Sequence, residues 1–182
     1  AGNVQEIFGI KTDINLLGQK IKEAFDNHPI AGGKQFQLWF EPGKVMVSEC
    51  GYLLTGVTVL KDTGAIEFAA VNSGLNHLIR PMMYDAYHHI VNLSNPAGKH
   101  KRYTVTGNIC ETDTFAWDRR ISEVREGDIL CFLNAGAYGH TMSSNYNSRP
   151  RPAEVMIHNG KDYLIRKRET LDDILRNEVV VD

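Results

Sequence analysis

The sequence has little cysteine: Cys50, Cys110 and Cys131 are the only thiols, and their spacing fits no common metal site. A small, odd number of thiols argues against a disulfide framework and favours a reducing compartment. The chain also lacks any apolar run that approaches about 18 residues, so no membrane span is expected. We therefore expect a cytoplasmic protein with no metal site and no membrane association.

An excess of charge of either sign is also missing. The 182 residues hold 20 Lys and Arg against 22 Asp and Glu, a net charge of −2. The most basic stretch, residues 166–168, is short and is typical of a solvated strand end. This balance argues against binding to nucleic acid or to a membrane surface. The length allows one domain with a core, or a small domain plus part of another.

One helix and one strand are expected in the first 43 residues. Residues 13–27 have apolar side chains at helical spacing, namely Ile14, Leu17, Ile21, Ala24 and Phe25. The segment "QFQLWF", residues 35–40, alternates polar and apolar side chains and ends at Pro42 and Gly43, which predicts a strand. A helix followed by a strand is typical of an α/β unit.

After residue 44 the pattern changes to short strands and turns, which predicts a closed or sandwiched β domain. Asn159-Gly160 is a strong hairpin signal, and Thr170 with Asp173 resembles a capping box that starts a helix. The predicted strands cover residues 45–50, 52–60, 66–71, 102–106, 129–134, 153–158 and 163–167, and the predicted helices cover 82–89 and 170–177.

Polar clusters at the ends of these strands are candidates for a functional site, because loops carry most binding and catalytic residues. In "FEPGK", Gly43 permits close backbone approach between Glu41 and Lys44, although an ordinary turn with an exposed ion pair also explains the pattern. In "LIRPMMYDAYHH", Arg80 can form a two-pronged bond to a carboxylate, and Tyr84 can add a donor. The alternative is an arginine that ties a helix to the sheet.

Two further clusters follow later in the chain. Cys110 stands directly before Glu111, and a carboxylate beside a thiol disfavours the thiolate that a nucleophile needs. The alternative is a buried cysteine that packs as a small apolar group. Tyr138 lies between Gly136 and Gly139 and can present its hydroxyl to a phosphate while backbone amides approach. A polar loop that caps a helix explains this cluster equally well.

Taken together, several sequence segments resemble the C-terminal part of the diaminopimelate decarboxylase family, within the fold-type III pyridoxal-phosphate decarboxylases. They are "FEPGK", "LIRPMMYDAYH", "GNICETDTFAWDR", "GDILCFLNAGAYGHTMSSNYNSRPRPAEV" and "LIRKRETLDDIL". The combination of "CET" and a following aspartate with "GAYG" and "SSNYNSRPRPAEV" is highly specific. The similarity runs from about residue 36 to residue 176.

The resemblance implies a mainly β protein with some α structure. Residues 43–182 would form a C-terminal Greek-key-type β-barrel domain with a terminal helix. Residues 1–42 would be the last helix and strand of a (β/α)8 barrel that binds pyridoxal 5′-phosphate. The chain would then be a C-terminal fragment that lacks the Schiff-base lysine of the cofactor, so we expect it to be inactive on its own.

The resemblance also implies a reaction for the full-length enzyme, the conversion of meso-diaminopimelate to L-lysine and carbon dioxide, the last step of lysine biosynthesis. Cys110 would be the catalytic acid that protonates the carbanion, which suits a thiol kept protonated by its neighbour. In this family the Cys–Glu loop reaches the partner subunit's site, so a homodimer is implied. The cofactor-binding residues would be Glu41, Gly43 and Tyr138, and the substrate-binding residues would be Lys44, Arg80, Tyr84, Glu111 and Tyr138.

The chain departs from the family pattern at three positions. Lys44 stands where the family usually has arginine, which keeps the charge and loses the two-pronged geometry. Asn72 and His77 stand where the family usually has acids, and we expect these changes to alter local pairing only. The alternatives are a decarboxylase of a related amino acid (ornithine, arginine or carboxynorspermidine) and a non-catalytic dimerisation module of the same fold.

Overall fold

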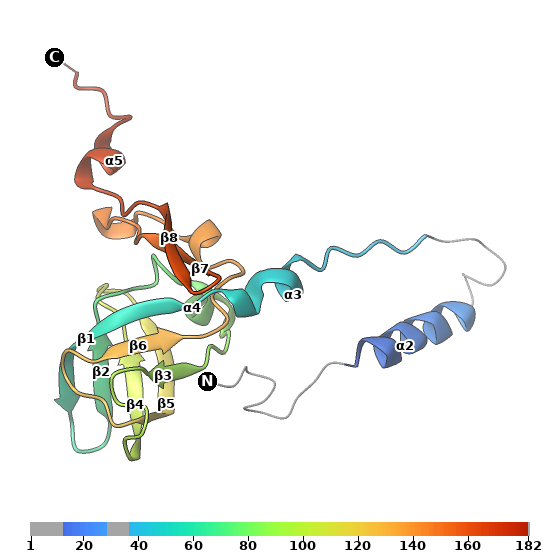
Figure 1. Cartoon of the computed structure of the whole chain (residues 1–182), viewed down its shortest axis with the longest axis horizontal. Helices are drawn as coiled ribbons and strands as arrows, with labels where there is room; N and C mark the ends of the chain where they lie inside the picture. Colours follow the sequence, from blue (N-terminus) through green and yellow to red (C-terminus); the bar gives the residue numbers. More distant parts are fainter. Residues whose placement is uncertain (1–12, 29–36, 182) are drawn as a thin grey trace. The chain divides into compact units, whose positions relative to one another are not determined.

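A computed structural model describes residues 13–28 and 37–181 of the chain (Figure 1). The chain divides into two units between Gly43 and Lys44, and each unit is described by itself.

In the first unit, helix α2 spans Ile14–Asp26 and confirms the predicted helix. The carboxylate of Asp13 caps its first turn by accepting a hydrogen bond from the Leu16 amide at 2.9 Å. The predicted strand at residues 35–40 is wrong where it can be checked, because residues 37–40 have no regular secondary structure, and residues 35 and 36 lie outside the described residues. Apolar alternation alone does not make a strand, since a strand also needs a neighbour for its backbone hydrogen bonds.

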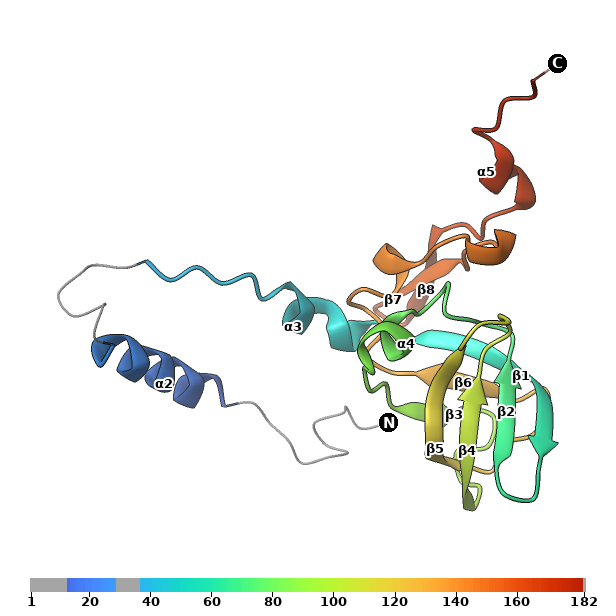
Figure 2. The same ribbon diagram turned by 180° about the vertical axis from the view of Figure 1, so that it is seen from behind.

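The second unit is built on a six-stranded sheet in the order β3-β6-β1-β2-β4-β5 (Figure 2). Neighbouring strands are antiparallel except β2 and β4, which are parallel. The end strands β3 and β5 also contact each other, so the sheet nearly closes into a barrel and confirms the expected β-barrel class. The strands are β1 Leu53–Asp62, β2 Glu67–Val71, β3 Ile90–Asn92, β4 His100–Thr106, β5 Thr114–Ser122 and β6 Ile129–Phe132.

The inner faces of these strands form one hydrophobic core. Phe115 of β5 packs on Phe132 of β6 with ring centroids 4.9 Å apart. Tyr103 of β4 is fully buried, and its hydroxyl oxygen accepts a hydrogen bond from the Val124 amide at 3.0 Å, which satisfies its polar atom. The other fully or nearly fully buried core residues include Ala69, Val71, Leu78, Ile90, Val105, Ile121 and Leu130.

Residues 45–50 form helical structure and not the predicted strand. Helix α3 spans Gly43–Val47, and the short 3₁₀ helix η1 spans Ser48–Cys50. The carbonyls of Ser48 and Gly51 accept hydrogen bonds from the amides of Gly136 and Ala135, at 3.1 and 2.8 Å. A Cβ atom at Gly136 would lie 1.9 Å from the Val47 carbonyl oxygen, so only glycine permits this contact. The carbonyls of Ser48 and Gly51 therefore bond to the loop after β6 and not to a neighbouring strand.

Helix α4 spans Arg80–Tyr84, which is earlier and shorter than the predicted helix at 82–89. Pro81 occupies its first turn, where a missing amide hydrogen costs nothing. Asp85 has a left-handed backbone (φ 50°) that ends the helix. The following residues lead directly into β3, a strand that the sequence did not predict; β5 was missed as well.

The C-terminal hairpin and helix confirm the sequence predictions. Strands β7 Glu154–His158 and β8 Lys161–Arg166 pair antiparallel around Asn159 and Gly160, whose φ values of 50° and 73° are those of a tight hairpin turn. Helix α5 spans Leu171–Leu175, and the predicted capping box between Thr170 and Asp173 is present.

A buried carboxylate links two loops at one end of the barrel. Asp113 is 5% exposed and accepts hydrogen bonds from the backbone amides of Leu75 at 2.7 Å and Ile109 at 2.9 Å. A Cβ atom at Gly107 would lie 2.0 Å from one oxygen of this carboxylate. Burial raises the pKa of Asp113, while the two backbone donors oppose that rise. The loop at residues 107–113 is thus fastened to the loop at residues 73–79.

We expect Asp113→Ala to lower the free energy of unfolding by about 2–4 kcal/mol, because two backbone N–H groups lose their acceptor in a buried place. Urea unfolding measures the change. Asp162→Ala is the control, since Asp162 is exposed on β8 and we expect a change below about 0.5 kcal/mol there. Equal midpoints for the two variants would contradict the anchoring role.

Candidate active site

Arg80 lies between two tyrosines. Its guanidinium carbon is 5.7 Å from the ring centroid of Tyr84 and 5.6 Å from that of Tyr138. Both tyrosines are exposed, whereas Arg80 is half-buried. The structure therefore brings together three of the residues singled out in the sequence, and the group offers one cation and two hydroxyls to a ligand. Such a set suits a carboxylate or a phosphate.

The backbone around each member explains its position. Arg80 begins α4, directly before Pro81. Tyr138 has a left-handed backbone (φ 58°) in the loop after β6, the loop that Gly136 allows to approach α3 and η1. An unusual backbone at a non-glycine residue of a ligand-binding loop is a recurrent feature of functional sites.

Lys44 belongs to the same neighbourhood as Arg80. Burial lowers the pKa of His88, and the positive charges of Arg80, Lys44 and Arg119 lower it further, against the opposing effect of the Leu133 carbonyl. His88 is buried, and its Nδ1 lies 2.8 Å from the Leu133 carbonyl oxygen, so Nδ1 carries the proton and donates. A neutral imidazole thus stands beside several cations and adds no charge of its own.

Glu41 and Gly43 lie in the first unit. Both are exposed, and the Gly43 amide donates to the Glu41 carbonyl at 2.9 Å. Among the described residues, a Cβ atom at Gly43 would have no neighbour within 4 Å, so the close backbone approach expected of this glycine is absent there.

Cys110 and Glu111 lie together on an exposed loop. The thiol Sγ of Cys110 is 3.4 Å from Oε2 of Glu111, and both residues are exposed. The alternative of a buried, packed cysteine is therefore wrong for Cys110, although it describes Cys131. The loop closes through a hydrogen bond from the Gly107 amide to the Asp113 carbonyl at 2.7 Å.

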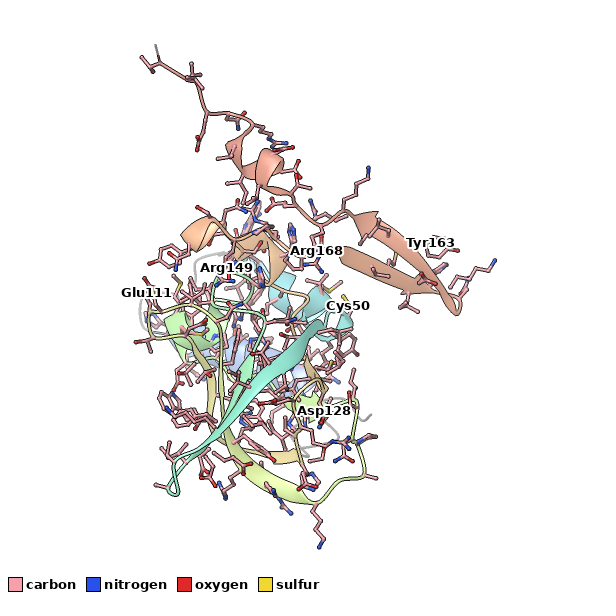
Figure 3. All side chains as sticks on the ribbon, turned by 90° about the vertical axis from the view of Figure 1, so that its left-hand side faces the viewer. Cys50, Glu111, Asp128, Arg149, Tyr163 and Arg168 are labelled. Carbon is pink, nitrogen blue, oxygen red and sulfur yellow. The ribbon has the colours of Figure 1, made fainter. Side chains whose placement is uncertain are left out.

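A third residue joins this pair from a distant part of the chain. The hydroxyl of Tyr146 donates a hydrogen bond to Oε1 of Glu111 at 2.5 Å. This bond lowers the pKa of Glu111 and raises the pKa of Tyr146. Figure 3 shows Glu111 and Arg149 on neighbouring loops, and the Arg149 guanidinium donates to the Asn108 carbonyl at 3.1 Å. The group therefore holds the Glu111 carboxylate between a thiol and a phenol hydroxyl.

The two groups of residues are separate on one chain. In the described part, no hydrogen bond or ring contact joins Arg80, Tyr84 or Tyr138 to the Cys110–Glu111 pair. They are connected through the loop at residues 73–79, which leads into α4 and is fastened to the Cys110 loop by Asp113. The same loop accepts a hydrogen bond from the Ser144 amide at the Asn76 carbonyl, at 2.9 Å.

His77 strengthens this connection. One ring nitrogen is 3.0 Å from the Ser73 hydroxyl, and the other is 3.1 Å from the Pro150 carbonyl. Burial is the main cause that lowers its pKa. His77 therefore forms a bridge between the loop at residues 73–79 and the segment around Pro150.

Sequence reasoning missed Tyr146 and the anchoring role of Asp113. Tyr146 stands within "TMSSNYN", which is rich in hydroxyl and amide side chains, and this composition was a signal of function. Nothing in the sequence indicates that this tyrosine reaches a glutamate 35 positions away.

The described residues offer neither a metal site nor a membrane-spanning helix. No three His, Cys, Asp or Glu side chains there lie close enough to hold a metal ion. No helix there is long and apolar enough to cross a membrane.

Comparison with known proteins places these features in a family. The family described as "Pyridoxal-dependent decarboxylase, C-terminal sheet domain" matches residues 40–136. A diaminopimelate decarboxylase of Methanothermobacter thermautotrophicus is 44% identical over 171 residues, which is 92% of this chain and 40% of that protein. One from Aquifex aeolicus is 49% identical over 136 residues, which is 74% of this chain and 32% of that protein.

Solved structures show the same similarity. A crystal structure of diaminopimelate decarboxylase from Methanocaldococcus jannaschii in complex with L-lysine superimposes with a TM-score of 0.76 and 33% identity, and covers 92% of this chain and 37% of that chain. The chain thus spans about two fifths or less of the relatives that it matches. Since the family match covers more than half of its residues and the fold is shared, the chain belongs to the pyridoxal-dependent decarboxylases and carries their C-terminal sheet domain.

Proposed function

We propose that the full-length protein containing this chain is a pyridoxal-phosphate-dependent carboxy-lyase that converts meso-diaminopimelate to L-lysine and carbon dioxide. The observation that carries this proposal is the exposed Cys110–Glu111 pair on a chain that also presents Arg80 between two tyrosines. Curated relatives at 44% and 49% identity are diaminopimelate decarboxylases, which supports the same substrate here.

The residues present suit an anionic cofactor. The ring of Tyr138 is exposed, its hydroxyl makes no hydrogen bond within the described part, and the Arg80 cation lies beside it. Tyr138 would contact the cofactor, with Glu41 and Gly43 on the side of its phosphate. When bound, pyridoxal phosphate accepts the electron pair that decarboxylation leaves on carbon. Its Schiff-base lysine would belong to a barrel domain outside this chain.

The substrate has a second amino-acid end that must be held away from the reaction. Arg80 and Tyr84 would bind the carboxylate at this distal end, with Lys44 adding positive charge nearby. Glu111 would accept its ammonium group. A substrate with both charges at its distal end makes use of both groups of residues, whereas ornithine and arginine offer no distal carboxylate for Arg80.

Cys110 would deliver the proton that replaces the lost carboxylate. Its thiol lies on an exposed loop, 3.4 Å from Oε2 of Glu111, and a thiol in such a position can donate a proton as a general acid. A free, reduced thiol in this role suits a reducing compartment, so we place the enzyme in the cytoplasm.

We infer that the site is shared in a homodimer. On one chain no hydrogen bond or ring contact within the described residues joins the Arg80 group to the Cys110–Glu111 pair, which supports the idea that each serves a different site. A two-fold arrangement brings the Cys110 loop of one chain to the Arg80 group of the other. Residues 1–42 would close the cofactor barrel, and residues 43–182 would supply the shared β domain.

Product analysis tests the substrate. We expect the full-length protein with pyridoxal phosphate to release carbon dioxide and form L-lysine from meso-diaminopimelate. Release at least as fast from ornithine, arginine or carboxynorspermidine would assign it to the related decarboxylases instead.

We expect Cys110→Ala in the full-length enzyme to reduce kcat by about a hundredfold or more, because general acid catalysis contributes on this scale. Steady-state kinetics measure the loss, and circular dichroism checks that the fold is intact. Cys50→Ala is the matched control, since Cys50 is also an exposed thiol and should leave kcat unchanged. A Cys110→Ala enzyme within twofold of wild type would exclude Cys110 as the proton donor.

Mixed dimers test the shared site. Cys110→Ala and Arg80→Gln should each be nearly inactive alone. After unfolding and refolding in a 1:1 mixture, half of the dimers should be hybrids with one intact site, which restores about a quarter of wild-type activity. If Cys110 and Arg80 served the same site on one chain, the mixture would stay as inactive as its parts.

A further inference from the structure

The carboxylate of Glu111 is engaged at both oxygens. Oε2 faces the Cys110 thiol at 3.4 Å, and Oε1 accepts the Tyr146 hydroxyl at 2.5 Å. Glu111 therefore bridges a thiol and a phenol, and its orientation depends on both. The thiol is the weaker of the two donors, so the phenol is the main restraint.

Tyr146 is itself fixed from two sides. Its amide donates to the Ser144 hydroxyl at 3.3 Å, and the Ser144 amide donates to the Asn76 carbonyl at 2.9 Å. On the other side, Arg149 donates to the Asn108 carbonyl of the Cys110 loop at 3.1 Å. The loop that presents the phenol is therefore fastened to both loops that carry the candidate site.

The backbone beside Tyr146 is unusual. Asn147 and Ser148 have left-handed φ values of 55° and 54°, a conformation that costs free energy at residues other than glycine. This turn also brings the side-chain nitrogen Nδ2 of Asn147 to 4.0 Å from the Cys110 sulfur. Two strained residues directly after Tyr146 indicate that its loop is shaped to meet the Cys110–Glu111 pair.

The charge of Glu111 is left without a counterion. Within the described residues it forms no ion pair, and its side-chain partners are the Tyr146 hydroxyl, the Cys110 thiol and the Asn147 amide. By contrast, Glu169, bonded to the same loop through Asn145, pairs with Arg151 at 3.0 Å. Neutral donors orient a carboxylate and leave its negative charge free to attract a cation.

We propose that Tyr146 is a positioning residue that holds Glu111 in place for the ammonium group at the distal end of the substrate, and so determines selectivity for that group. This inference rests on the proposed function and adds a residue to which no role had been given. Tyr146 acts through Glu111 and does not touch the reacting atoms.

Tyr146→Phe in the full-length enzyme tests the proposal, because it removes the hydroxyl and keeps the ring. We expect KM for meso-diaminopimelate to rise about tenfold, as for loss of a hydrogen bond to a charged group, with kcat changed less than about threefold. The inhibition constant of D-2-aminopimelate, which lacks the distal amine, should stay the same. Tyr163→Phe is the matched control, since Tyr163 is 43% exposed against 44% for Tyr146 and lies on the β7–β8 hairpin (Figure 3).

A double-mutant cycle separates positioning from a general structural effect. In a Glu111→Gln background, Tyr146→Phe should cause no further rise in KM, because the group through which it acts is already altered. Additive effects of the two changes, or an unchanged KM in the single variant of an active enzyme, would overturn the proposal.

The coupling of Tyr146 to Glu111 can also be measured without enzyme activity, by titrating the Glu111 carboxylate. This measurement is independent of whether the proposed function is right. With ¹³C-labelled glutamate in the full-length protein, Tyr146→Phe should raise the pKa of Glu111, and Tyr163→Phe should not. An unchanged Glu111 titration overturns the coupling of Tyr146 to Glu111. A wild-type enzyme that does not act on meso-diaminopimelate overturns the proposed function, and with it the assignment of the ammonium group.

Discussion

The buried carboxylate of Asp113 is the constraint on which the candidate site depends. It accepts amide hydrogen bonds from Leu75 and Ile109, and the space beside it is open because Gly107 and Gly74 carry no Cβ. Cys110 and Glu111 lie in the chain between Ile109 and Asp113, which are joined by one of these hydrogen bonds. The position of the pair is therefore set by a polar anchor inside the protein and not by the sheet, whose strands end before this loop.

In the proposed homodimer, the same anchor would help one chain to serve two sites. The barrel core supplies a rigid platform, and the chemical groups are on loops at its edge. The loop at residues 73–79 holds the Cys110 loop through Asp113, accepts the Ser144 amide at Asn76, and continues into Arg80. Movement of one group would thus strain the others. A shared site in a dimer needs such stiffness, because each half must meet the other without adjustment.

Local signals predicted much of the fold. The Asn159-Gly160 hairpin and the Thr170 capping box depend on a few neighbouring residues, and both are present. The segment at 45–50 has the composition of a strand but is helical, and the loop at 135–136 bonds to the carbonyls of Ser48 and of Gly51, which follows the segment. Strand β3 has three residues and too short a pattern to recognise. The motifs indicated the Arg80 and Cys110 groups, while Tyr146 depends on a contact between distant loops.

Among the candidate residues, Glu111 carries a negative charge whose position is fixed by hydrogen bonds. Arg149, on the same loop as Tyr146, donates to a backbone carbonyl, and Glu111 forms no ion pair with any residue in the part of the chain that the structure describes. Its lowered pKa keeps Glu111 ionised at neutral pH. An oriented and ionised carboxylate without a counterion is better suited to recognising an ammonium group than to stabilising the fold, since an exposed carboxylate contributes little to stability. Under the proposed function, selectivity for a substrate with a positive distal end would depend on how this one side chain is held.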